Sequence, residues 1–398
     1  MNIKSDFPIF KTYPELIYLD NGATTQKPQI MLDSLIEYYS KKNSNIGRSV
    51  YKLAEISEVA YENSRKKIAN FVGANKKNII FTKGATESLN QAAYVSSQLL
   101  KSGSKILLSI YEHHANILPW QKIAQEKNLE LIFIDNEEYL ANPEKMPESI
   151  WDNVSLVALT HVSNVTGQIH PVAKWCKIAR EKNIITCIDG SQGVVSEQIN
   201  LSEINCDFYA FSAHKLYGPM GLGILYIHQD ILNKKLHPSL LGGGIIEEVL
   251  KENYTLLEGA LRFEAGTPNV ADVYAFAQTL DYLKDNNWQD LLLKSHKLTE
   301  YLIEQLSAIT EIAIIKPKLL PVSHMVSFVV NNVHAHDLGT YLSNYNICVR
   351  VGKHCAHPLH DLLDINSSVR ASIGIYNTQE DIDHLIIYLR KAIKFFGE

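Results

Sequence analysis

Short apolar runs alternate with helical patterns through the first two thirds of the chain. Seven of these runs have the length and the β-branched or aromatic character of buried strands. They are Asn78–Thr82, Lys105–Ile110, Glu130–Asp135, Val154–Val162, Asn183–Asp189, Asp207–Ser212 and Leu222–Ile227. Between some of them the pattern predicts helices, at Thr86–Lys101 and Pro171–Lys182. This alternation predicts an α/β fold with a mostly parallel seven-stranded sheet, covered by helices on both faces.

The pattern changes after about residue 270. The spacing of apolar residues predicts long helices at Val270–Leu283 and Trp288–Ile309, then a strand at Val326–Asn331, a helix near Asp337–Ser343 and a final helix. Thr378 followed by Asp381 is typical of a helix start. We expect the final helix to keep one apolar face, made of Ile382, Leu385, Ile386, Leu389, Ile393 and Phe396. The chain would then divide into a large domain, 15–285, and a smaller α+β domain, 286–398, joined by residues 1–14.

Composition and charge exclude several classes of protein. The chain has 398 residues, of which 46% are hydrophobic and 20% charged, as in a folded globular protein. A net charge of −5 argues against nucleic-acid binding. The longest charge-free stretch, 154–173, contains polar His161 and Asn164, so we expect no membrane span. The first ten residues carry no leader pattern, and five cysteines without a C-x-x-C pair favour a reducing cytoplasm.

Two charged residues follow predicted strands and suggest a cofactor. Lys215 comes shortly after one strand, and a partly buried lysine has the lowered pKa that a Schiff base requires. Asp189 ends another strand, where a carboxylate can pair with the ring nitrogen of pyridoxal phosphate. A solvated lysine and a loop aspartate are the alternatives for each residue alone. The glycines at 218–223 precede a strand, so they do not match a dinucleotide-binding fingerprint.

Two further segments also follow strands. Thr82–Glu87 opens a helix, so its backbone N–H groups and the Thr86 hydroxyl favour a phosphate site, with simple helix capping as the alternative. His113 and His114 are adjacent, and adjacent side chains rarely face one metal ion. We therefore interpret one of these imidazoles as stacking on an aromatic cofactor, and we expect no metal.

One cysteine has unusual neighbours. Cys355 lies in a short loop with Arg350, Lys353 and His354, and cationic neighbours favour the nucleophilic thiolate. The other cysteines, at 176, 187, 206 and 348, lie in apolar runs and are expected to be buried. Arg370 has the planar guanidinium that suits a substrate carboxylate, with an ordinary surface arginine as the alternative.

In this order, these segments resemble the cysteine desulfurases of the Suf-like group, within the fold-type I pyridoxal-phosphate enzymes of the class V aminotransferase family. The resemblance runs from Tyr18-Leu19-Asp20-Asn21 to Tyr376-Asn377-Thr378. Its most specific stretches are SAHKLYGPMGLGILY at 212–226, RFEAGTPN at 262–269 and GKHCAHP at 352–358. It implies that the protein converts L-cysteine to L-alanine and leaves a persulfide on Cys355. The sulfur would pass to a Suf-type acceptor for iron–sulfur cluster assembly, and selenocysteine could react in the same way.

The resemblance also implies a role for each matching residue. Lys215 would hold pyridoxal 5′-phosphate and move protons at the substrate Cα, and His113 would stack on the cofactor ring and help with proton transfer. Asp189 would face the ring nitrogen and Gln192 the phenolic oxygen. The cofactor phosphate would be bound by Ala85, Thr86, Ser212 and His214, and by Thr267 from the second subunit of a homodimer. The substrate would be bound by Asn164 and Arg370, and by Arg350 from the Cys355 loop.

The chain departs from the family in four places. In the segment Asn45–Tyr51, Gly47 and Tyr51 replace two histidines, and Ser49 replaces a glycine. We expect this segment to border the site entrance and to influence sulfur transfer more than cofactor binding. Val351 and Lys353 also differ from the usual residues of the cysteine loop. Gly22 and Ala213 are changes between small residues, from which we expect little effect.

Two other functions stay open at this point. The same fold also supports other pyridoxal-phosphate reactions, such as transamination or a kynureninase-like cleavage. Cys355 in its basic loop argues against these, because they need no thiol. A non-catalytic scaffold for sulfur assembly is the second alternative. The joint presence of Lys215, Asp189 and His113 argues against it.

Overall fold

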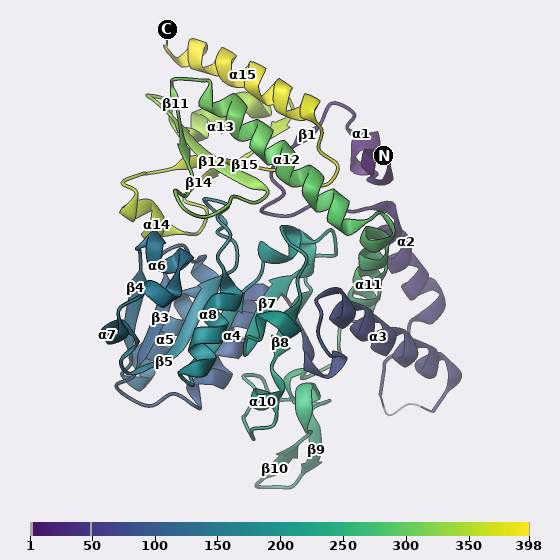
Figure 1. Cartoon of the computed structure of the whole chain (residues 1–398). Helices are drawn as coiled ribbons and strands as arrows, with labels where there is room; N and C mark the ends of the chain where they lie inside the picture. The colour runs from purple at the N-terminus through teal and green to yellow at the C-terminus, as the bar shows by residue number, and fades with distance from the viewer. Residues whose placement is uncertain (1–2, 48–49, 398) are drawn as a thin grey trace.

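A seven-stranded sheet lies at the centre of the larger of two layered parts of the molecule (Figure 1). The computed structural model describes residues 3–47 and 50–397. In spatial order the strands are β2 (Ile79–Thr82), β8 (Gly223–Ile227), β7 (Phe208–Ser212), β6 (Ile185–Asp189), β5 (Val154–Thr160), β3 (Lys105–Ser109) and β4 (Glu130–Ile134). Only β8 runs antiparallel to its neighbours within this sheet. The predicted α/β fold and the seven predicted strands are confirmed.

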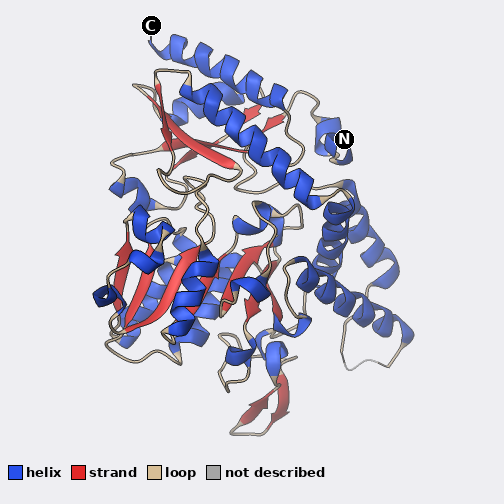
Figure 2. Ribbon diagram, viewed as in Figure 1, coloured by secondary structure: helices blue, strands red, loops and turns tan. Residues whose placement is uncertain are grey.

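Helices cover both faces of this sheet (Figure 2). Strand side chains alternate between two apolar clusters, as the pleat requires. Leu107 and Val157 point to the cluster that holds Trp175 of one helix, and Ile106 and Ala158 point to the cluster under the opposite helices. The covering helices are α8 (Val172–Glu181) on the first face, and α4 (Ala85–Ser97) and α5 (Leu118–Lys127) on the second. Both predicted helices of this region are present.

A second, antiparallel sheet packs with the C-terminal helices. Its four strands are, in spatial order, β11 (Ile312–Ile315), β12 (Met325–Val330), β15 (Ser368–Ser372) and β14 (Arg350–Gly352). The helices against it are α12 (Trp288–Ser307), α13 (Ala335–Ser343) and α15 (Gln379–Gly397). The Thr378 N–H donates to Asp381 Oδ2 at 3.2 Å, so the predicted start of the last helix is confirmed. Phe396, placed on its apolar face by the spacing, is 37% exposed because the helix extends past the sheet.

The N-terminal segment is divided between the two sheets: Ile17 and Leu19 lie in the apolar cluster of the second sheet, whereas Phe7 lies in that of the large sheet. β1 (Ile17–Tyr18) pairs in parallel with β13 (Ile347–Cys348). Phe7 packs edge-on against Tyr376, with ring centroids 4.7 Å apart. Two segments more than 300 residues apart in the sequence therefore lie side by side, near the boundary between the two sheets.

The remaining elements lie outside the two sheets. α2 (Gln29–Glu37) and α3 (Lys52–Phe71) pack on α11 (Val270–Asp285). A hairpin of β9 (Ile246–Val249) and β10 (Tyr254–Leu256) projects away from both sheets (Figure 1). The shorter helices are α1 (Ile9–Thr12), α6 (Glu137–Ala141), α7 (Glu148–Trp151), α9 (Leu201–Ile204), α10 (Gln229–Leu232) and α14 (His357–Leu362). Within residues 3–47 and 50–397, no helix combines the length and the apolar composition needed to cross a membrane.

Candidate functional site

Four predicted site residues lie at or just after the carboxyl ends of neighbouring strands in the large sheet. Asp189 ends β6, and Lys215 ends a short 3-10 turn that follows β7. Asn164 and His113 lie in the segments that follow β5 and β3. In an open α/β sheet this edge is where ligands bind, because the strand ends and their loops converge there. The strand order therefore brings these four residues to the same edge of the sheet.

Lys215 lies in an environment that disfavours its charge. Burial lowers the pKa of Lys215 to about 8, while the Asp189 carboxylate acts in the opposite direction and raises it. Arg370 lowers this pKa further, and the Cys355 thiolate raises it. A substantial fraction of the amine is therefore neutral near physiological pH, as attack on a carbonyl carbon requires. These interactions also bring Asp189, Arg370 and Cys355 into electrostatic contact with one lysine.

His113 is held as a neutral imidazole with one defined tautomer. Its Nδ1 accepts a hydrogen bond from the Ala115 N–H at 3.1 Å, so its proton resides on Nε2. Burial lowers the pKa of His113 to about 4, and the nearby Lys215 adds to this effect. A neutral ring can stack on an aromatic cofactor without adding a buried positive charge.

The predicted phosphate-binding residues lie around the start of α4. The Ala85 N–H donates to Ser212 Oγ at 2.7 Å, which joins the helix start to the end of β7. A Cβ on Gly223 would lie 2.6 Å from the Gly84 Cα, so only glycine lets β8 approach this turn. Thr86 is exposed in the first turn of α4, and burial lowers the pKa of His214 to about 4.

Several buried polar atoms of the predicted site have no hydrogen-bond partner. They are Gln192 Oε1, His214 Nδ1, His354 Nδ1 and Arg370 Nε. Such atoms are rare in folded proteins, because each unpaired buried group costs free energy. The Gln192 amide is nevertheless oriented, since its Nε2 donates to the Gly22 carbonyl at 2.7 Å. Unpaired polar atoms gathered in this way fit a site that receives a polar ligand such as pyridoxal phosphate and an amino acid.

The Cys355 loop, between β14 and α14, docks on the edge of the large sheet. The His114 N–H donates to the Cys355 carbonyl at 2.8 Å, and Asn164 Nδ2 donates to the His354 carbonyl at 2.6 Å. His354 and Cys355 both have left-handed backbone angles, with φ of 49° and 54°. Two consecutive residues of this kind without glycine are strained, which is common at functional sites. The loop therefore presents an exposed Cys355 next to the residues at the strand ends.

The cations near Cys355 have partners that the sequence pattern does not indicate. Arg350 forms a two-pronged ion pair with Asp20, and Lys353 Nζ lies 2.8 Å from Asp361 Oδ1. Burial, with a contribution from Arg370, lowers the pKa of His354, so this ring is neutral. The positive charge around the thiol is therefore smaller than the sequence suggests. Arg350, expected to bind substrate, is occupied by a carboxylate of the chain itself.

Arg370 keeps one edge available for a ligand. Its Nη1 donates to the Asn164 carbonyl at 2.7 Å, Nη2 lies 3.6 Å from Asp20 Oδ1, and Nε is unpaired. Burial lowers the pKa of Arg370 to about 10, so the group stays charged at neutral pH. Nε and Nη2 form the side of a guanidinium that binds a carboxylate with two hydrogen bonds. The geometry fits the predicted contact with a substrate carboxylate.

Sequence reasoning missed two carboxylates at this site. Glu112 is fully buried and accepts hydrogen bonds from the Thr160 N–H and from Asn116 Nδ2, each at 2.7 Å. The bond from Thr160 connects the His113 segment to the end of β5. Burial raises the pKa of Glu112 to about 8. Glu112 directly precedes the two histidines in the sequence, so it could have been predicted as a site residue from its position. Asp20 carries no such signal, because its partner Arg350 is 330 positions away.

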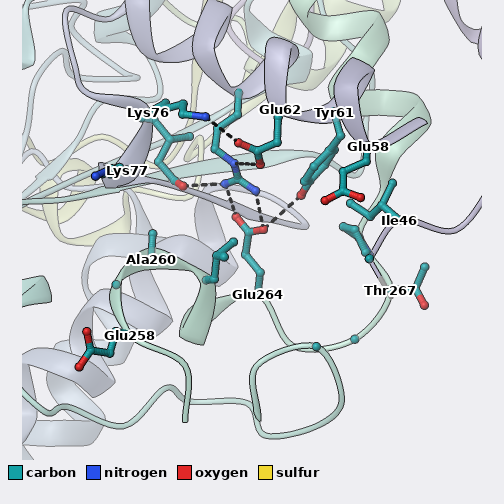
Figure 3. A pocket seen from close by; sticks show the side chains of 18 of the residues that line it. Ile46, Glu58, Tyr61, Glu62, Lys76, Lys77, Glu258, Ala260, Glu264 and Thr267 are labelled. Carbon is teal, nitrogen blue, oxygen red and sulfur yellow. Dashed lines mark hydrogen bonds and ion pairs between the residues drawn. The ribbon is translucent and has the colours of Figure 1, made fainter. Parts of the chain in front are cut away.

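Thr267 lies apart from the other predicted phosphate ligands. It is exposed and lines a separate cavity of about 840 Å³, together with Ile46 and Gly47 (Figure 3). The cavity wall contains an Arg65–Glu264 ion pair, with Nη1 and Oε1 2.6 Å apart. Gly47 has a φ of +75°, and the Tyr51 hydroxyl lies 2.8 Å from Ser44 Oγ. Arg48 and Ser49, from the same divergent segment, lie outside the described residues.

Comparison with known proteins identifies the family. The model of the class-V aminotransferases, a family that depends on pyridoxal 5′-phosphate, matches residues 17–385. A probable cysteine desulfurase of Halobacterium salinarum is 35% identical, over 99% of this chain and 97% of its own length. The solved cysteine desulfurase of Thermococcus onnurineus is 36% identical with a TM-score of 0.93, covering 98% of this chain and 97% of that chain. The solved cysteine desulfurase CsdA of Escherichia coli is 32% identical with a TM-score of 0.90, covering 98% of this chain and 98% of that chain. The chain therefore belongs to the class-V aminotransferase family and, within it, to the cysteine desulfurases.

Proposed function

We propose that the protein takes sulfur from L-cysteine, stores it as a persulfide on Cys355 and releases L-alanine. One observation carries this proposal: the strained loop of Cys355 is hydrogen-bonded to His114 and Asn164, and its thiol is in electrostatic contact with Lys215. Transamination or a kynureninase-like cleavage would give no role to an exposed thiol at that point. A desulfurase needs a nucleophile there.

The residues at the strand ends would serve the cofactor. Bound pyridoxal phosphate supplies an electron sink that stabilises negative charge at the substrate Cα. The partly neutral amine of Lys215 would hold the cofactor and afterwards move a proton at Cα. The Asp189 carboxylate would favour a protonated ring nitrogen, and the neutral His113 ring would stack on the cofactor ring. Gln192 would bind the phenolic oxygen, and the phosphate would be held by Ala85, Thr86, Ser212 and His214.

The residues of the second sheet and its loop would serve the substrate. Arg370 binds the substrate carboxylate through its unpaired edge, and Asn164 lies beside it. The Cys355 thiolate attacks the sulfur of the substrate, forming an S–S bond while the substrate C–S bond breaks. The electrons of that bond remain on carbon, which takes up a proton and leaves as alanine. Arg350, paired with Asp20, has no place among these ligands.

The direct experiment supplies L-cysteine to the cofactor-loaded protein. Alanine should appear in step with enzyme-bound sulfur, and mass spectrometry after a single turnover should find the added sulfur on the peptide that contains Cys355. Formation of pyruvate or of an oxo acid without bound sulfur would support transamination or another reaction of the family. Added sulfur on Cys348 would contradict the assignment of the nucleophile.

We infer a homodimer in which Thr267 reaches the cofactor phosphate of the partner subunit. In support, Thr267 is exposed and lines a cavity that no other predicted site residue lines. Each subunit would then complete the site of the other through a closed two-fold interface. In sedimentation experiments the cofactor-loaded protein should be dimeric, and Thr267→Ala should weaken cofactor retention. A stable monomer with full cofactor occupancy would contradict this arrangement.

The cellular role follows the same proposal. We infer a cytoplasmic enzyme that delivers sulfur to a Suf-type acceptor for iron–sulfur clusters. Selenocysteine is a second candidate substrate, because selenium is more easily attacked than sulfur. Restoring histidine at both Gly47 and Tyr51 should change acceptor-stimulated turnover and leave cofactor binding unchanged. An equal change in cofactor binding would place this segment in the cofactor site instead.

A further inference from the structure

Asp20 connects the two arginines of the predicted substrate site. Arg350 Nε donates to Asp20 Oδ1 at 3.0 Å, and Arg350 Nη2 donates to Asp20 Oδ2 at 2.6 Å. Asp20 Oδ1 also lies 3.6 Å from Arg370 Nη2. The Asp20 side chain is only 13% exposed, so the pair with Arg350 is partly shielded from water. A two-pronged pair of this geometry is much stronger than an ordinary surface ion pair.

The strand pairing places Asp20 at this point. β1 and β13 are parallel, with Tyr18 opposite Cys348. Two residues further along each segment, Asp20 comes to lie beside Arg350, at the first residue of β14. The backbone holds Asp20 in place, because it forms a bridge with Ser372 and its carbonyl accepts from the Ala23 N–H at 3.1 Å. The carboxylate is therefore fixed by the fold and does not depend on a mobile loop.

We propose that Asp20 is a built-in counter-anion that occupies Arg350, so that only Arg370 is left to bind an anionic ligand beside Cys355. Two guanidinium groups and one carboxylate leave one net positive charge. That charge matches a ligand with a single carboxylate, such as an amino acid with a neutral side chain. A second negative charge on the ligand would meet an Arg350 whose Nε and Nη2 donors are already paired with Asp20. Asp20 is thus a specificity-determining residue, and Arg350 is a positioning residue at the base of the Cys355 loop.

Electrostatic contacts support this division. Cys355 interacts electrostatically with Arg350 and with Arg370. The net charge of the two arginines and Asp20 therefore attracts or repels a charged reagent that approaches the thiol. Asp20 also opposes the effect of burial on the pKa of Arg370 and helps to keep that guanidinium charged. The inference deepens the proposed function, since it rests on Cys355 and Arg370 facing the same ligand. Its test is nevertheless independent of desulfuration.

The test compares how fast Cys355 reacts with an anionic and with a neutral alkylating reagent. The thiolate displaces iodide from either iodoacetate or iodoacetamide, and peptide mapping of the purified protein gives the rate at Cys355. The rate ratio of iodoacetate to iodoacetamide measures the local charge, because the two reagents differ by one negative charge. Asp20→Asn should raise this ratio about threefold or more, since it adds one unit of net positive charge beside Arg350 and Arg370, which both interact with the thiol.

A second variant separates charge from loosening of the loop. Arg350→Gln breaks the same ion pair but removes a positive charge, so it should lower the ratio by a similar factor. The double variant Asp20→Asn/Arg350→Gln restores the net charge and should return within about twofold of the wild-type ratio. A shift of the ratio in the same direction in both single variants would overturn the proposal, because it would show that the loop had merely opened.

Asp361→Asn is the matched control. Asp361 pairs with Lys353 of the same loop but is 68% exposed, so its removal should change the ratio less than twofold. A change as large as that of Asp20→Asn would mean that any charge near the loop has this effect, and the proposal would be wrong. Failure of the wild type to release alanine would contradict the proposed function alone, since the alkylation ratios do not depend on turnover.

Discussion

The two halves of the candidate site are built in different ways. At the edge of the large sheet, Asp189 and Lys215 are placed by β6 and β7, which are buried except at Ile185, the first residue of β6. In the other half, Arg370 lies on β15, a buried strand of the second sheet, whereas the Cys355 loop is positioned by contacts between distant segments, such as Asp20 with Arg350. The first half depends on one buried sheet, whereas the second combines a buried strand with ion pairs and a strained loop. We therefore expect variants in the first half to remove cofactor chemistry, and variants in the second to alter sulfur and substrate selection.

Lys215→Ala should have the largest effect. Without the amine, the cofactor loses its covalent link and the substrate loses its proton carrier, so desulfuration should fall on the order of 10³-fold or more. Borohydride should no longer fix the cofactor to the protein. Lys235→Ala, which changes an exposed lysine, is the control and should be neutral in both assays. Borohydride-fixed cofactor in Lys215→Ala would assign the linkage to another lysine.

Cys355→Ala should separate the two halves. Alanine release should drop to background, because no other exposed thiol is found among the described residues. Cofactor binding should stay at the wild-type level, since Lys215 and Asp189 are untouched. Cys348→Ala is the matched control: burial raises the pKa of Cys348, so its thiol is a poor nucleophile and its loss should change alanine release little. If Cys355→Ala released alanine at the wild-type rate, Cys355 would not be the nucleophile of the reaction.

The same difference between the halves explains what could be predicted from the sequence. Buried strands leave apolar runs, so the sheet and the residues at its strand ends, such as Asp189 and Lys215, follow from local pattern. The pairing of β1 with β13 involves two residues on each side and leaves no pattern, so the partner of Arg350 could not be predicted. The β9–β10 hairpin was also missed, because its strands are largely exposed and show no core-facing alternation.

The pH dependence of cofactor attachment should report on both halves at once. Only the neutral amine of Lys215 reacts, so the attachment rate should rise about tenfold per pH unit and level off above pH about 8. Arg370 lowers the pKa of Lys215, so Arg370→Gln should move the midpoint to higher pH. Asp189 raises this pKa, so Asp189→Asn should move it to lower pH. Stopped-flow absorbance of the apoprotein with added pyridoxal phosphate measures the midpoint. If both variants moved the midpoint in the same direction, the electrostatic interactions of Arg370 and Asp189 with Lys215 would be contradicted.

The smallest effect is expected where the halves touch, at Gly22. A Cβ at this position would lie 3.1 Å from both Cζ and Nη2 of Arg370 and 3.3 Å from the Met325 Cε. The guanidinium would have to move by a few tenths of an ångström, away from the position in which Nε is unpaired and Nη2 lies 3.6 Å from Asp20 Oδ1. The sequence alone predicts little effect from glycine at this position. In the structure, its small size leaves room for the Arg370 guanidinium that would bind the carboxylate.

Gly22→Ala should raise the KM for L-cysteine about two- to fivefold and leave kcat nearly unchanged, because the carboxylate contact is made equally before and during the reaction. Met325 packs on the same position, and its flexible side chain can yield, which keeps the effect small. The Gly22 carbonyl also orients Gln192, but the backbone is unaltered in this variant, so cofactor absorbance should not change. A fall in kcat with KM unchanged would instead show that Gly22 affects the cofactor, and Gly22 would then belong to the cofactor-binding half of the site.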